Sequence, residues 1–121
     1  MKKTIKLFAF SICLFSFSGS IFSQSVYVNE TDINKLNIKY CELRVGQPLN
    51  PTKVKIFVDY GQAFSIKRQN IMTPDKKVVK FNSAVHALNF MDRNGWDYIE
   101  IVAVQAGETT TFKYVMQKTK E

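Results

Sequence analysis

The stretch most informative about the fold is residues 83–117, SAVHALNFMDRNGWDYIEIVAVQAGETTTFKYVMQ. Asn82 or Ser83 is a suitable N-cap, because a short polar side chain can accept a hydrogen bond from a free backbone N–H of the first turn. Apolar residues then recur at i, i+3, i+4 and i+7, namely at Ala84, Ala87, Leu88 and Met91. Asn94 and Gly95 follow, and both tolerate the left-handed conformation that ends many helices. The stretch therefore begins with one amphipathic helix.

A strand and a hairpin follow the helix. Residues 96–105 are apolar on both predicted faces, with Trp96, Tyr98, Val102 and Val104 on one and Ile99, Ile101 and Ala103 on the other. A strand that is apolar on both faces is typical of the covered centre of a sheet. Residues 106–109 form a short loop, and residues 110–117 return as a second strand.

Further strands are predicted upstream of the helix. Residues 37–45 and 53–60 are rich in β-branched and aromatic residues, and the connection between them contains one glycine and two prolines. Residues 78–81 provide a short third strand. The predicted fold class is α+β, a small antiparallel sheet of about four strands with one helix packed on one face, in the order β-β-(β)-α-β-β. We expect a single domain over 37–121, preceded by a polar, irregular N-terminal arm at 24–36.

Several short motifs resemble a class of small uncharacterised exported bacterial ββαββ domains with a helix-Asn-Gly-Trp-strand-hairpin signature. The motifs are Phe81-Asn82-Ser83, Ala87-Leu88-Asn89-Phe90-Met91, Asn94-Gly95-Trp96-Asp97, Tyr114-Val115-Met116 and the earlier Asp59-Tyr60-Gly61-Gln62. The resemblance supports the same fold. It implies no activity and no catalytic residue, because the class has no assigned function.

Residues 1–23 have the three parts of an export signal. Three lysines lie within the first six residues, an apolar run covers 7–17, and small residues fill most of 18–23. We predict cleavage after Ser23, with Ser20 as the alternative. Cys13 lacks the small residue that precedes the cysteine of a lipoprotein signal, because Ile12 stands there. The mature chain is therefore expected to be periplasmic or secreted.

Removal of the signal also changes the charge. The whole chain carries +7 and the mature chain about +4, because the signal contains three lysines and no acidic residue. A charge of that size is ordinary for solubility and gives no reason to expect a nucleic-acid partner. The apolar run of the signal is shorter than the roughly 20 residues that span a bilayer, so we expect no stable membrane insertion of the mature chain.

The nucleophilic and metal-binding residue types are sparse. Cys41 is the single cysteine left after cleavage, and a free cysteine in a strand is usually a small buried apolar residue. His86 is the single histidine and is predicted on the surface of the helix, without a second ligand at a suitable spacing. We therefore expect no metal, no cofactor and no catalytic residue.

Three functions remain open. The favoured one is a non-enzymatic, protein-binding or self-associating module that uses the sheet face opposite the helix, because one helix cannot cover both faces of an apolar strand. The second is a small envelope hydrolase with Glu100 or Asp59 as its carboxylate. The third is a binder of polyanions or cell surfaces through the basic stretch of residues 67–80, which contains Lys67, Arg68, Lys76, Lys77 and Lys80.

Overall fold

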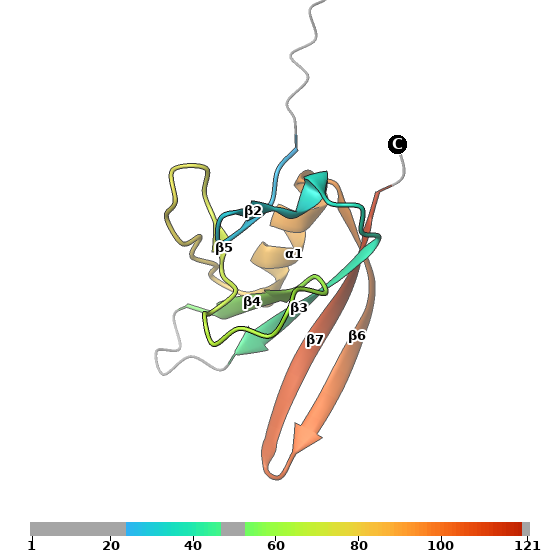
Figure 1. The fold of residues 1–121 in the computed structure, drawn as a ribbon. Helices are drawn as coiled ribbons and strands as arrows, with labels where there is room; N and C mark the ends of the chain where they lie inside the picture. Colours follow the sequence, from blue (N-terminus) through green and yellow to red (C-terminus); the bar gives the residue numbers. More distant parts are fainter. Residues whose placement is uncertain (1–23, 47–52, 120–121) are drawn as a thin grey trace, which may run out of the picture.

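The computed structural model describes residues 24–46 and 53–119 and confirms the α+β class (Figure 1). Within them lie a four-stranded and a three-stranded antiparallel sheet and a single α-helix, α1 (Ala84–Arg93). The predicted export signal at 1–23 lies outside the described residues, as does most of the connection before the second predicted strand.

The larger sheet has the order β4 (Lys55–Asp59), β3 (Tyr40–Gly46), β7 (Thr109–Lys118), β6 (Trp96–Ala106). The strand predicted to be central, β6, is therefore an edge strand, and that prediction was wrong. Strand β3 pairs with β7 only from Phe112 to Gln117, so the outer part of the β6–β7 hairpin has no third strand beside it. In Figure 1 this hairpin runs well beyond the rest of the molecule.

A β-bulge changes the faces of β6. Its register against β7 shifts between Tyr98 and Glu100, so that Ile99 has no partner. Residues that are directly opposite on neighbouring strands share a face, and the extra residue reverses the alternation beyond it. Trp96 and Tyr98 consequently share a face with Ile101 and Ala103. Val102 and Val104, which the sequence placed on the same face as Trp96, lie on the other face.

The N-terminal segment is more ordered than its polar composition predicted. It contains β1 (Tyr27–Val28), β2 (Thr31–Asp32) and a 3-10 helix at Ile33–Lys35, and it pairs with β5 (Ile71–Met72) in the order β2-β1-β5. Its buried side chains are Val26, Val28 and Ile33. The third strand predicted at 78–81 is absent from the described residues, which have only isolated bridges there, Val54 to Phe81 and Met72 to Val78.

Helix α1 begins and ends as its sequence predicted. The Ser83 hydroxyl accepts a hydrogen bond from the backbone N–H of His86 at 3.1 Å, and Gly95 has a φ of +89° just after the helix. Ala87 and Met91 are buried and Leu88 is half-buried. They join a core that includes Trp96, Met116 and Cys41, so the helix covers the base of the sheet and not its outer end.

Candidate functional site

The β6–β7 hairpin exposes large apolar side chains on the same face of the sheet that α1 covers at Trp96 and Met116. Tyr98 is 51% exposed, Ile101 47% and Phe112 43%. By register they share this face with Ala103, Tyr114 and the buried Met116. We call Tyr98, Ile101, Ala103, Phe112 and Tyr114 the hairpin strip. The strip continues the core outward to a place where no described element covers it.

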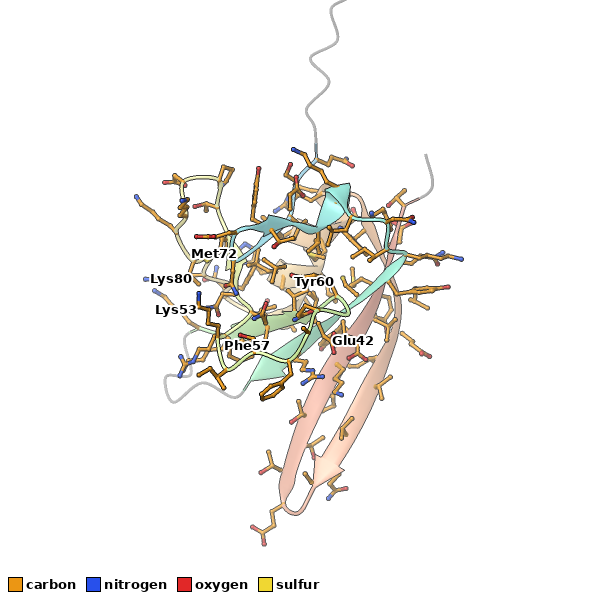
Figure 2. The ribbon with its side chains drawn as sticks, in the orientation of Figure 1. Glu42, Lys53, Phe57, Tyr60, Met72 and Lys80 are labelled. Carbon is orange, nitrogen blue, oxygen red and sulfur yellow. The ribbon has the colours of Figure 1, made fainter. Side chains whose placement is uncertain are left out.

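The opposite face of the sheet, expected to be apolar, alternates charged and apolar residues. One row runs Asp59, Glu42, Val115, Glu100 across the four strands, and the next runs Phe57, Arg44, Lys113, Val102. Figure 2 labels Glu42 and Phe57 on this face. The segment after β4 also lies against it, because residues 62–65 and 67–69 line a hollow of about 430 Å³ together with Arg44 and Phe57. The exposed apolar surface of the four-stranded sheet is therefore concentrated on the hairpin.

The outer edge of β6 has little of the protection that edge strands normally carry. Residues 101–105 read Ile-Val-Ala-Val-Gln, with no charge and no proline, and the side chains of Ile101, Val102 and Val104 are exposed. Natural edge strands usually carry lysines, prolines, bulges or a covering loop, and these features prevent pairing with another strand. Here the bulge and the two acids, Asp97 and Glu100, lie before this segment and leave it open.

The two catalytic candidates are not brought together. The Asp59 carboxylate forms an ion pair with Arg44 at 3.2 Å and accepts a hydrogen bond from the Gly61 backbone N–H at 3.0 Å. Glu100 lies three strands away in the same row, which is about 14 Å at the usual strand spacing. Paired carboxylates of glycosidases are about 5 to 9.5 Å apart. The sequence did not indicate that Glu42 is the cross-strand neighbour of Asp59, because pairing register is not visible in one strand alone.

The basic stretch is divided between separate parts of the structure. Lys67 and Arg68 lie on the loop after β4, between the hollow described above and a second one of about 490 Å³ that also contains Lys76 and Glu30. Lys77 forms an exposed ion pair with Asp75 at 3.7 Å. Lys80 lies close to Lys53 in Figure 2, where the bridge between Val54 and Phe81 joins their segments.

The cysteine and the histidine have structural contacts. Cys41 is buried, as predicted, and burial together with the negative charges of Asp59 and Glu42 raises the pKa of its thiol to about 12. Such a thiol is almost entirely protonated at neutral pH and is a poor nucleophile. Nδ1 of His86 accepts a hydrogen bond from the Asn82 backbone N–H at 3.1 Å, and its ring meets the edge of Phe81.

Two absences hold for the part of the chain that the structure covers. Residues 24–46 and 53–119 contain no group of three or more His, Cys, Asp or Glu side chains placed to hold a metal ion. No helix in the same ranges has both the length and the apolar character to cross a bilayer.

No family model, curated protein or solved structure matches this chain. The resemblance to small exported ββαββ domains therefore stays a prediction.

Proposed function

We propose that this protein is a non-enzymatic, self-associating module in which the edge of β6 pairs with β6 of a second copy. The observation that supports this most directly is the free edge at residues 101–105, which is uncharged and exposes apolar side chains on both faces. Exposed apolar surface of this kind usually marks an interface. Strand addition also satisfies the backbone N–H and C=O groups that an edge strand leaves to water.

Antiparallel pairing suits β6 better than parallel pairing. A twofold axis near Val102 or Ala103 would place Glu100 of one copy opposite an uncharged residue of the other, Val104 or Ala106. Parallel pairing in register would place the two Glu100 carboxylates side by side, where they repel. A twofold-related pair is also closed, so that association stops at a dimer.

The hairpin strip gives the proposed dimer its apolar contacts. With the twofold axis perpendicular to the sheet, the strips of both copies lie on the same face of one continuous eight-stranded sheet. Ile101 of one copy then lies opposite Ala103 or Gln105 of the other, and Ala103 is small enough for close approach of the two strands. Each such cross-strand pair contributes about 0.2 to 1 kcal/mol, so several are needed for a measurable dimer.

Light scattering over a concentration series of residues 24–121 tests the proposal, with a Val102→Lys variant beside the wild type. We expect a mass that rises toward the dimer for the wild type and at least about tenfold weaker association for Val102→Lys, because the twofold axis brings the two new charges together. Val85→Lys is the matched control, since Val85 is exposed on α1 and is not part of the β6 edge. Its association should equal that of the wild type.

A wild type that stays monomeric up to roughly 1 mM would overturn self-association. Strand addition by another protein would then be the remaining use of this edge. Association that Val102→Lys leaves unchanged would show that the copies meet through a different surface.

We also propose that the module works outside the cytoplasm, periplasmic or secreted. Residues 1–23 support this through their export pattern. The intact mass of the exported protein tests it, and we expect the chain to begin at Gln24. A mass that includes an acylated Cys13 would contradict cleavage after Ser23.

A further inference from the structure

The loop between β4 and β5 is held at both ends by the same residue. The Gln62 side-chain amide donates to the Val58 carbonyl at 3.0 Å, and the Val58 backbone N–H donates to the Gln69 carbonyl at 2.9 Å. A bridge between Phe57 and Asn70 continues this contact. Compact loops whose ends meet in this way are often functional. Residues 63–68 therefore form the tip of a closed loop that is anchored on the sheet.

The tip exposes two large apolar side chains almost completely. Phe64 is 95% exposed and Ile66 94%, about twice the exposure of the hairpin strip. The tip is not merely extended chain, because the Lys67 backbone N–H donates to the Ser65 hydroxyl at 3.1 Å and the Gln69 side chain donates to the Lys67 carbonyl at 3.1 Å. The loop thus holds two apolar side chains in water where they have no packing partner in the described residues.

Positive charge lies directly beside these side chains. Lys67 and Arg68 follow Ile66 in the sequence and are exposed, and neither forms an ion pair within the described residues. The acid that lines the first hollow, Asp59, is already paired with Arg44. The second hollow contains one acid, Glu30, against Lys67, Arg68 and Lys76. The loop tip therefore combines apolar exposure with an excess of positive charge.

We propose that this loop docks the protein peripherally onto a lipid surface with anionic headgroups. Phe64 and Ile66 enter the boundary between headgroups and acyl chains, and Lys67 and Arg68 contact the headgroup phosphates. Lysine and arginine side chains can keep their charged group in the headgroup layer while their methylene groups cover apolar surface. A soluble polyanion would use the two cations but would offer nothing to the two apolar side chains, which is why the lipid surface is the better partner.

Vesicle flotation tests the proposal with residues 24–121, which contain every described element and lack the apolar segment at 7–17. Vesicles of phosphatidylglycerol and phosphatidylcholine should carry the wild type upward, and vesicles of pure phosphatidylcholine should not. Phe64→Ser and Ile66→Ser should each weaken binding about tenfold, since each removes a large apolar side chain from the contact. Lys67→Gln and Arg68→Gln should each weaken it about fivefold and reduce its salt dependence.

Val85→Ser is the matched control for the apolar variants, because Val85 is also exposed but lies on α1. Lys35→Gln is the control for the charge variants, because Lys35 is exposed on the 3-10 helix. Neither should change flotation. The substituted loop side chains are exposed, so the variants should fold, and thermal unfolding followed by circular dichroism tests this.

A Phe64→Trp variant gives a direct view of the contact. Trp96 is fully buried, so that a blue shift on addition of anionic vesicles would come from residue 64. We expect the shift with anionic vesicles only, and quenching by lipids brominated near the headgroup. Absence of wild-type flotation, or flotation unchanged in Phe64→Ser and Ile66→Ser, would overturn the proposal. The proposal would also be overturned if the charge variants lost binding to vesicles and to dextran sulfate equally while the apolar variants lost none. That result would favour a soluble polyanion as the partner.

Discussion

The two ends of the β6–β7 hairpin have similar composition and opposite environments. At the base, Trp96 and Met116 are fully buried, whereas Ile101 and Phe112 farther out on the same face are almost half exposed. The difference lies in what covers them. The ten-residue α1 is about 15 Å long, and the eleven-residue β6 is about 36 Å long. An apolar strand is thus buried only as far as a second layer reaches, and the remainder is available for a partner.

Truncation of Trp96 should have the largest effect on this comparison. Its side chain fills the core at the base, and its indole N–H donates to the Asn34 side-chain oxygen at 2.7 Å. Trp96→Ala should lower the free energy of unfolding by about 3 to 5 kcal/mol, which is a large part of the stability of a small domain. Urea unfolding followed by far-ultraviolet circular dichroism measures the loss.

Ile101→Ala is the matched control for Trp96→Ala, because both positions lie on the same face of β6. It should cost less than about 1 kcal/mol, as at other exposed sites. Both variants are measured at a concentration below that of the proposed dimer, so that association does not contribute. A loss of more than about 2 kcal/mol for Ile101→Ala would mean that the outer hairpin is packed against something within the monomer.

Substitution of Asn34 should lower the free energy of unfolding less than Trp96→Ala does, and it tests how the N-terminal segment is attached to the base of the sheet. Its side-chain amide donates to the carbonyls of Gln24 and Asn94 at 3.1 and 2.8 Å, while its oxygen accepts from Trp96. Asn34→Ala leaves the buried indole N–H without a partner, so we expect a loss of about 1 to 3 kcal/mol.

Asn37→Ala is a suitable control for Asn34→Ala, because Asn37 is exposed outside any strand or helix. It should change the unfolding free energy by less than about 0.5 kcal/mol. Equal losses for the two variants would show that the Asn34 contacts are not the attachment of the N-terminal segment.

The helix and the hairpin could be predicted because their signals are local. The N-cap Ser83, the apolar spacing that follows it and Gly95 all lie within one short stretch. The position of β6 at the edge could not be predicted, because a strand apolar on both faces is the same in sequence whether a sheet or a partner covers it. The bulge at Ile99 could not be predicted either, because it depends on the pairing register of β6 against β7.

The candidate surfaces were predicted less well than the fold. The sequence indicated that apolar surface would be left uncovered, but it placed that surface on the sheet face opposite the helix. No strand or helix was predicted for the loop with Phe64 and Ile66. Its exposure follows from hydrogen bonds at Val58 that join residues 62 and 69, and no local pattern in the sequence specifies such a closure. Likewise, the burial of Ile33 comes from packing of a polar segment over the core.

The pH dependence of stability reports on the covered base through Cys41. The folded-state pKa of its thiol, about 12, lies above the ordinary value of 9.0 because the thiolate would be buried and beside two acids. The folded state therefore keeps its proton at a pH where the unfolded state loses it. The contribution of the protonated thiol to the free energy of unfolding is fully present below pH 9 and is lost as the pH rises from 9 toward 12. We expect a loss of about 1 kcal/mol at pH 10 relative to pH 7, measured as the difference between the wild type and Cys41→Ala.

Thiol reactivity compares the covered base of the four-stranded sheet with the exposed part of the hairpin. Because burial raises the pKa of the Cys41 thiol to about 12, its thiolate fraction at pH 8 is far lower than that of a free thiol. A disulfide reagent should therefore modify it only as fast as the base unfolds. Ala103→Cys in a Cys41→Ala background places a thiol on the exposed hairpin strip and should react at the rate of a free cysteine. That rate should fall as protein concentration rises, because the proposed pairing brings β6 of the second copy directly beside residue 103. Rapid modification of Cys41 at pH 8 would show that water reaches the base, and the contrast between the covered and open ends of the hairpin would be lost.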